Sequence, residues 1–248
     1  MRSILITNDD GIDSPSLKIL TKKLTALGRV YIIVPERERS AGGHALTLHK
    51  PLRVYAIPWK YRDVKVWTTN GTPADCIMLG VYSLLPERPS FVISGINKGY
   101  NLGTDIIYSG TVSGAREASL KDIPAVSISV SAEAEKEDFE KAGEFLLRYI
   151  PKFSGLIPQG IFLNINIPPK ADIDDICITF QGKFHYKNCL EKRIDPRGVV
   201  YYWLHGEKEY NDEEGSDIWA VGSNKISITP LHSIMTYYPL IDVLKNSL

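Results

Sequence analysis

Two adjacent acids close to the N-terminus are the side chains best suited to chemistry. Asp9 and Asp10 follow a short run of branched apolar residues and stand directly before Gly11. Neighbouring carboxylates repel each other, and burying either is unfavourable unless a positive charge lies between them. A hard divalent cation such as Mg²⁺, Mn²⁺ or Ca²⁺ supplies that charge and prefers oxygen ligands. The pair predicts a cation site; an acidic turn before a helix beginning near Pro15 is the alternative, which accounts for one acid better than for two.

An α/β fold with a mostly parallel sheet would place these acids where ligands bind. Residues 4–6 and 29–34 are apolar runs typical of buried parallel strands, and the leucines between them recur at helical spacing. Such a strand–helix–strand unit is right-handed and parallel. Further strands are predicted over 91–94, 124–130 and 161–167, and helices over 73–84 and 133–149. Open α/β sheets bind ligands at the carboxyl ends of their strands, which is where the two acids stand.

Polar residues also follow other predicted strands. Ser40 precedes Ala41 and two glycines in the loop after the second strand, which reads either as an anion-binding nest or as an ordinary turn. Asn97 follows the strand at 91–94 and can lend an amide oxygen to a cation. Its loop has three glycines but lacks the G-x-G-x-x-G spacing of dinucleotide sites.

A stretch of small residues opens a further helix after residue 108. The hydroxyls of Ser109 and Thr111, with the first free N–H groups of the helix, would form a phosphate-sized cradle. A capped helix with a close-packed face of small residues is the alternative and explains Gly110 and Gly114 almost as well. Asp75, by contrast, stands at a position typical of a helix cap and is predicted to be structural.

Composition excludes several classes of protein. The 248 residues carry 29 basic and 29 acidic side chains, so no basic excess argues for wrapping a nucleic-acid duplex. Cys76, Cys177 and Cys189 are odd in number and far apart, which predicts neither a disulfide framework nor a cysteine zinc site. The chain has no signal-peptide core and no apolar run of membrane-spanning length, so we expect a cytoplasmic protein.

The alternation of helix and strand lapses after about residue 170. We predict a catalytic domain over residues 1–170, with a β-stranded excursion near 46–69, and a β-rich extension over 171–248. Strands are expected at 176–180, 199–204, 218–221 and 226–229. The clustered aromatic residues of this extension would pack on the main domain or form a subunit interface. Residues 161–167 would then be the last strand of the main sheet.

Six motifs occur in one order: ITNDDG (6–11), ERSAG (38–42), NGTPADC (70–76), SGIN (94–97), YSGTV (108–112) and SITPL (227–231). Together they resemble the SurE family of metal-dependent nucleoside monophosphate phosphatases, from residue 4 to about residue 231. The resemblance implies a Rossmann-like domain whose sheet is sandwiched by helices, with a C-terminal extension used to form a homodimer or homotetramer. It implies a 5'-nucleotidase acting on nucleoside 5'-monophosphates and leaves open whether 3'-nucleotides or polyphosphate are also substrates.

The resemblance also implies the site residues. One divalent cation per subunit, Mg²⁺, Mn²⁺ or a similar ion, would be held by Asp9, Asp10, Ser40 and Asn97. Phosphate would contact Asn101, Ser109, Gly110 and Thr111. We predict that Asp9 or Asp10 orients the attacking water, because both would lie beside the ion. Two other functions stay open: an aspartyl-phosphate phosphatase or phospho-receiver domain, and a non-enzymatic protein that binds nucleotide or polyphosphate.

Overall fold

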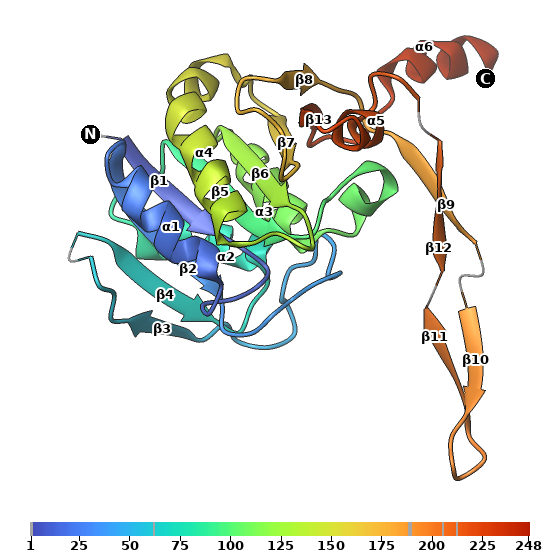
Figure 1. Cartoon of the computed structure of the whole chain (residues 1–248), viewed down its shortest axis with the longest axis horizontal. Helices are drawn as coiled ribbons and strands as arrows, with labels where there is room; N and C mark the ends of the chain where they lie inside the picture. The colour runs from blue at the N-terminus through green and yellow to red at the C-terminus, as the bar shows by residue number, and fades with distance from the viewer. Residues whose placement is uncertain (1, 62, 188–189, 205, 212) are drawn as a thin grey trace.

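A nine-stranded sheet runs through the computed structural model, which describes residues 2–61, 63–187, 190–204, 206–211 and 213–248 (Figure 1). Its strands, in spatial order, are β3 (Val54–Ile57), β4 (Lys65–Thr69), β2 (Gly28–Pro35), β1 (Arg2–Thr7), β5 (Phe91–Lys98), β6 (Ala125–Val130), β7 (Ile161–Ile167), β13 (Ile226–His232) and β8 (Ile176–Ile178). The strands from β4 to β7 are parallel to one another, whereas β3 and β13 run antiparallel to β4 and β7. The predicted α/β fold with a mostly parallel sheet is confirmed.

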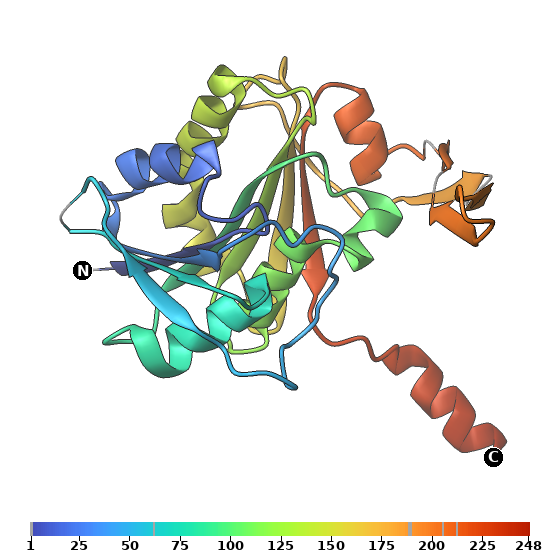
Figure 2. The ribbon, with the colours of Figure 1, turned by 90° about the horizontal axis from the view of Figure 1, so that it is seen from below.

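Helices cover both faces of this sheet (Figure 2). α1 (Pro15–Leu24) and α4 (Lys136–Leu156) pack on one face, and α2 (Pro73–Leu79) and α3 (Gly110–Ser119) on the other. Within β1, Ile4 and Ile6 belong to the first apolar cluster and Leu5 to the second, because successive side chains of a strand point to opposite faces. The parallel strands are thus buried on both sides, which accounts for their nearly continuous apolar runs.

Two short helical segments flank these helices. A π-helical turn (Gly80–Leu84) follows α2, and the 3₁₀ helix η2 (Gly103–Ile107) precedes α3. η2 lies between the end of β5 and the start of α3, so it sits in the loop that the sequence marks as rich in glycine and asparagine.

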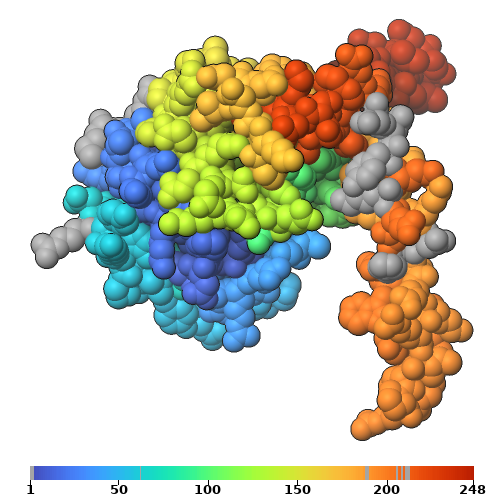
Figure 3. All heavy atoms as spheres, in the orientation of Figure 1, coloured from blue at the N-terminus to red at the C-terminus, as the bar shows by residue number. Residues whose placement is uncertain are grey.

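A long β-ribbon, which we call the arm, projects from the body (Figures 1 and 3). Its base pairs β9 (Lys183–Lys187) with β12 (Glu207–Asn211), and its tip pairs β10 (Leu190–Ile194) with β11 (Val200–Leu204). α5 (Asp217–Gly222) leads from the arm back to β13, and α6 (Tyr238–Ser247) follows β13 and has no buried residue. The arm keeps large apolar side chains in solvent; Trp203 is 56% and Leu204 84% exposed.

The structure corrects three predictions about the elements. Residues 161–167 are not the last strand of the sheet, because β13 pairs with β7 and β8 with β13. Residues 64–69 are not an excursion, since β4 lies parallel beside β2 within the sheet. Residues 218–221 form helix α5 rather than a strand, because the Ser216 hydroxyl accepts a hydrogen bond from Trp219 N at 3.1 Å and caps a helical turn. A four-residue apolar run does not distinguish the two.

The remaining expectations concern thiols and membranes. Cys76 and Cys177 carry free thiols, and Cys189 lies outside the described residues. Among the residues that the structure describes, none of the helices combines the length and the apolar character that a membrane span needs. The proposed boundary at residue 170 stays a prediction; β8 and β13, which lie beyond it, complete the central sheet.

Candidate functional site

The four predicted cation ligands lie at the carboxyl ends of three adjacent strands. Asp9 and Asp10 follow β1, Ser40 lies in the loop after β2, and Asn97 is the last residue but one of β5. The spatial order β2-β1-β5 makes these strands neighbours. Parallel strands expose their carboxyl ends at one edge, so the sheet carries all four residues to the same edge.

Asp9 is buried and held by the start of α3. Its Oδ2 accepts a hydrogen bond from Thr111 N at 3.1 Å, and its Oδ1 accepts one from the Thr111 hydroxyl. Gly110 permits this approach, since a Cβ there would lie 2.8 Å from Asp9 Oδ2. Burial raises the pKa of Asp9 above its ordinary value, although the bonds from Thr111 favour the charged form. The helix N-terminus thus binds the carboxylate of this chain, a contact that the sequence analysis did not foresee.

Asp10 lies in a strongly negative setting. Burial, together with the negative charges of Asp9 and Glu38, raises the pKa of Asp10 to about 6. The Ser14 hydroxyl, which donates to Asp10 Oδ2 at 3.4 Å, opposes this rise. Glu38 was not predicted as a site residue, because its place in a run of alternating charges is typical of a solvated face. The negative charge accumulated here is the charge that a bound divalent cation would neutralise.

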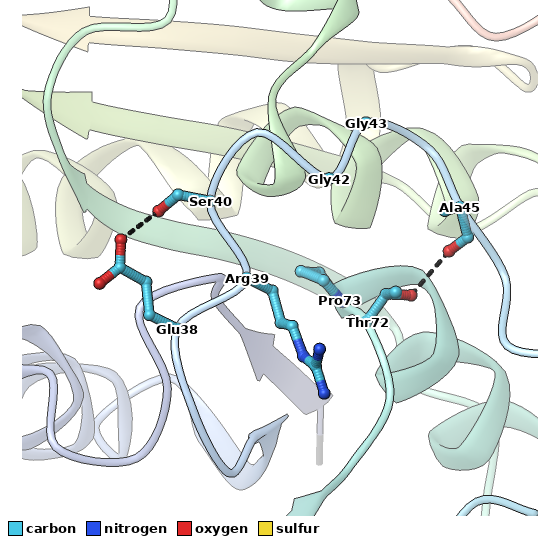
Figure 4. Close-up of a pocket in the computed structure, with 8 residues that line it drawn as sticks. All are labelled: Glu38, Arg39, Ser40, Gly42, Gly43, Ala45, Thr72 and Pro73. Carbon is cyan, nitrogen blue, oxygen red and sulfur yellow. Dashed lines mark hydrogen bonds between the residues drawn. The ribbon is translucent and has the colours of Figure 1, made fainter. Parts of the chain in front are cut away.

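The neutral oxygens of the predicted set are placed by the loops that carry them. Arg39 N donates to the Asp9 carbonyl at 2.7 Å, which attaches the loop after β2 to the end of β1. The Ser40 hydroxyl donates to Glu38 Oε1 at 2.6 Å (Figure 4). A bulge in β5 shifts its pairing with β6 between Ser94 and Asn97. Asn97 Nδ2 donates to the Gly99 carbonyl at 2.8 Å, so the amide oxygen is the atom of Asn97 that could face a cation.

The chemistry of this donor set suits a hard cation. Among the described residues, no three His, Cys, Asp or Glu side chains are grouped as metal ligands. The predicted set instead combines two carboxylates with a hydroxyl and an amide oxygen. Such an all-oxygen set with few charges fits a cation that keeps several waters, as Mg²⁺ does.

Most polar groups of the predicted phosphate contacts already bond other residues of the chain. Ser109 caps α3, its hydroxyl accepting from Val112 N at 3.0 Å, and the donors of Thr111 serve Asp9. Asn101 is buried: its Nδ2 donates to the Ser129 hydroxyl at 2.9 Å. Its carbonyl accepts from the amides of Asn164 and Asn166. The N–H groups of Thr111 and Val112 are already bonded, so the Ser109 O–H and the Gly110 N–H remain as the donors that this turn can offer to an anion.

Both sequence-based interpretations of α3 describe part of the helix. It is capped by Ser109, and its small-residue face packs closely, since a Cβ at Gly114 would lie 2.6 Å from Ser94 Oγ. Its first turn nevertheless carries donors to the carboxyl edge of the sheet, where Asp9 lies. A role in binding phosphate stays a prediction.

A pocket of about 550 Å³ opens beside Ser40 (Figure 4). Its walls are Glu38, Arg39, Ser40, Gly42, Gly43 and Ala45 of one loop and Thr72 and Pro73 of another. The Thr72 hydroxyl donates to the Ala45 carbonyl at 2.7 Å and joins the two walls. Asp75 caps α2 through Thr72 and also accepts from Thr47 N at 3.0 Å, so the structural role predicted for Asp75 is confirmed.

His44, for which the sequence suggests no partner, pairs with a residue of α3. Its Nε2 lies 2.8 Å from Glu117 Oε2, and Lys121 Nζ lies 3.2 Å from Glu117 Oε1. Burial opposes ionisation of Glu117, but the hydrogen bonds from His44 and Lys121 outweigh it and lower the Glu117 pKa. The loop that carries Ser40 is thereby fixed to the same helix that binds Asp9.

Comparison with known proteins identifies the family of this chain. The model of the family described as "Survival protein SurE" matches residues 4–188. A protein of Moorella thermoacetica named 5'-nucleotidase SurE is 47% identical over 95% of this chain and 92% of its own length. One of the same name from Pelotomaculum thermopropionicum is 45% identical over 99% and 95%. The crystal structure of a SurE protein from Aquifex aeolicus superposes with a TM-score of 0.82 at 39% identity and covers 99% of both chains. The chain belongs to the SurE family.

Proposed function

We propose that this chain is a metal-dependent 5'-nucleotidase that hydrolyses nucleoside 5'-monophosphates to nucleoside and phosphate. The observation that carries the proposal is the buried Asp9 carboxylate, seated on the first turn of α3 at a strongly negative sheet edge. The nucleotidase class predicted from the sequence is borne out by the relatives named 5'-nucleotidase SurE. The metal, the individual site residues and the oligomeric state are our own proposals.

Asp9, Asp10, Ser40 and Asn97 would hold one divalent cation. Such a cation, when bound, neutralises phosphoryl charge and lowers the pKa of water. Thr111 binds both carboxylate oxygens of Asp9 and so fixes the orientation of this ligand. Asp10 is less buried than Asp9 and can orient a water that attacks phosphorus. The Ser109 hydroxyl and the Gly110 N–H, at the start of α3, would hold phosphate oxygens.

The nucleoside would lie in the pocket beside Ser40. Its volume of about 550 Å³ falls within the range of small-molecule sites, roughly 300–1,000 Å³. The loop that forms one wall also carries Ser40, so a ligand could fill the pocket with its nucleoside and reach the cation residues with its phosphate.

The spacing of the two acids weighs against a covalent mechanism. An aspartyl-phosphate phosphatase usually carries the pattern Asp-x-Asp, whereas Asp9 and Asp10 are adjacent in this chain. Trapping of a phosphorylated aspartate after incubation with substrate would favour that alternative. Tight nucleotide binding without phosphate release would favour a non-enzymatic binding protein.

A phosphate-release assay over a panel of nucleoside 5'-monophosphates tests the proposal. We expect release with Mg²⁺ or Mn²⁺, abolition by a chelator, and recovery when the cation is added back. A 3'-nucleotide and a polyphosphate, tested in parallel, measure the breadth of substrates. Phosphate release that continues unchanged in excess chelator would refute metal dependence. The absence of phosphate release from every nucleotide, with each cation tested, would refute the nucleotidase activity.

We infer that further copies of this chain cover the arm and α6, in a homodimer or homotetramer. The arm exposes a run of large apolar side chains, and α6 has no buried residue, so both surfaces would be solvated in a monomer. Light scattering coupled to size exclusion measures the mass in solution; a monomer at micromolar concentration would refute the inference. The cytoplasmic location suggested by cysteine usage stays a prediction.

A further inference from the structure

Asp217 is a fully buried carboxylate for which the proposed reaction has no use. Its side chain belongs to the first residue of α5 and has no solvent exposure. Oδ2 accepts a hydrogen bond from Gly103 N at 2.8 Å, and Oδ1 accepts from Gly182 N at 2.8 Å and from Ile218 N at 2.9 Å. Burying a charge is unfavourable unless such bonds compensate for the lost water. Asp217 therefore joins three segments that are far apart in the sequence.

Gly103 is the point at which this cluster holds the loop between β5 and α3. Its backbone has φ +49°, and a Cβ there would lie 3.0 Å from side-chain carbons of Ile218 and Phe184. While Asp217 accepts from its N–H, Gln181 Nε2 donates to its carbonyl at 2.8 Å. Both polar groups of Gly103 are thus bound by residues next to the arm.

The same loop ends at the predicted phosphate contacts. Gly103 begins η2, and Ser109, six residues on, caps α3. Thr104 adds a further attachment, since its hydroxyl donates to the Phe184 carbonyl at 3.2 Å. At the far end, Gly43 N donates to the Tyr108 carbonyl at 2.9 Å and ties this loop to the one that carries Ser40.

We infer that Asp217 is a positioning residue, which couples the base of the arm to the placement of Ser109 and the first turn of α3. The inference rests on the proposed function for its kinetic consequence. Asp217 touches neither the predicted cation ligands nor the pocket; it acts by holding Gly103. Its loss leaves the Gly103 N–H without an acceptor in a buried place, which favours a shift of residues 103–109. Phosphate binding then weakens more than the chemistry at the cation edge.

Asp217→Asn is the direct test, because it keeps the shape and removes one acceptor oxygen. We expect KM for AMP and the inhibition constant of inorganic phosphate to rise about tenfold, as for the loss of one hydrogen bond to a charged group. kcat should change less. We also expect faster amide hydrogen exchange at residues 103–109. A purely structural role would lower the melting temperature and leave the inhibition constant, measured below that temperature, unchanged.

Thr179→Val is the matched control. Its hydroxyl is also buried and bonds Ser227 Oγ at 2.9 Å and Thr229 Oγ1 at 2.7 Å, so its hydrogen bonds lie within the C-terminal part and not with the loop that holds Gly103. We expect it to lower the melting temperature without changing phosphate inhibition. Should Asp217→Asn not fold, Gln181→Met decides the question, because it removes the bond to the Gly103 carbonyl and should raise the same constants roughly threefold.

The outcomes separate this inference from the proposed function. The positioning role would be overturned if Asp217→Asn kept the wild-type inhibition constant of phosphate and the wild-type amide exchange rates. It would also be overturned if Thr179→Val changed these two quantities as much as Asp217→Asn does. Both results are possible even if the wild type is a nucleotidase. A wild-type protein that releases phosphate from none of the nucleotides would overturn the proposed function. The exchange of residues 103–109 would then still decide whether Asp217 holds that segment.

Discussion

Gly110→Ala places a methyl group against Asp9 and tests whether the contact between α3 and β1 shapes the site. The new Cβ would lie 2.8 Å from Asp9 Oδ2, 2.9 Å from Asp9 Cβ and 3.2 Å from the Arg39 carbonyl. Two of these three atoms, the Asp9 Cβ and the backbone oxygen, cannot swing away as the end of a flexible side chain can. The contact with Oδ2 is about 0.6 Å short of ordinary van der Waals distance, which begins near 3.4 Å.

The clash of the new methyl group with Asp9 determines how much stability and activity the variant should lose. Overpacking costs about 1–3 kcal/mol, and the better helix propensity of Ala offsets up to about 1 kcal/mol. The net cost is then about 0–3 kcal/mol, and for a chain of this size we expect the melting temperature to fall by up to roughly 12 °C. Misplacement of catalytic groups by about 1 Å can lower the rate about 100-fold. A displacement of roughly half that size should lower kcat/KM about tenfold or more.

The assay is phosphate release from AMP, measured well below the melting temperature of each variant. Gly155→Ala is the control: it lies near the end of α4, and a Cβ there has no atom within 4 Å. It should leave activity near wild type and raise the free energy of unfolding by no more than about 1 kcal/mol, the gain in helix propensity from Gly to Ala. A Gly110→Ala variant with wild-type kcat/KM would refute the reasoning that this approach shapes the site. If the Gly110→Ala variant does not fold, the claim that the clash is local and costs only about 1–3 kcal/mol is wrong.

Other changes test the remaining parts of the site. Asp9→Asn should lower both metal occupancy, measured by calorimetry, and turnover; full activity with metal retained would remove Asp9 from the chemistry. Glu117→Gln should destabilise the fold by about 1–3 kcal/mol at neutral pH, because Glu117 bonds His44 and Lys121 while buried. Since folding lowers the Glu117 pKa, this stability is present above the ordinary value of 4.5 and is lost as pH falls through the lowered value. Denaturant titrations should therefore show the difference between the two proteins shrinking below about pH 4.5; a constant difference down to the lowest pH would contradict the ion pair. Trp203→Glu should reduce the mass in solution if the arm is an interface, and an unchanged mass would place the interface elsewhere.

The local elements were largely predictable because their signals lie within short stretches of chain. Branched apolar runs marked the buried strands, and the Thr72 and Asp75 pair marked the start of α2. The burial of Phe139, Ala142 and Phe145 in α4 follows from helical spacing. By contrast, the helical form of residues 218–221 was missed, because a four-residue apolar run lacks a periodicity that separates helix from strand. α6 was also missed, although Pro239 near its start and the apolar residues 240, 243 and 244 are typical of a helix.

The sequence by itself determined the family, the parallel α/β sheet and the edge at which the acids stand, since motif order and apolar periodicity are properties of the chain alone. Only the tertiary structure decided which groups meet there. Thr111 binds Asp9, which is 102 residues away in the sequence. Glu117 pairs with His44 at a separation of 73 residues, and Asp217 accepts a hydrogen bond from Gly103 at a separation of 114. Such contacts depend on how helices and loops pack on the sheet. The spacing of residues along the chain does not predict how remote segments pack together. The physical reason is that a buried carboxylate takes whichever donor the completed fold brings within hydrogen-bonding distance.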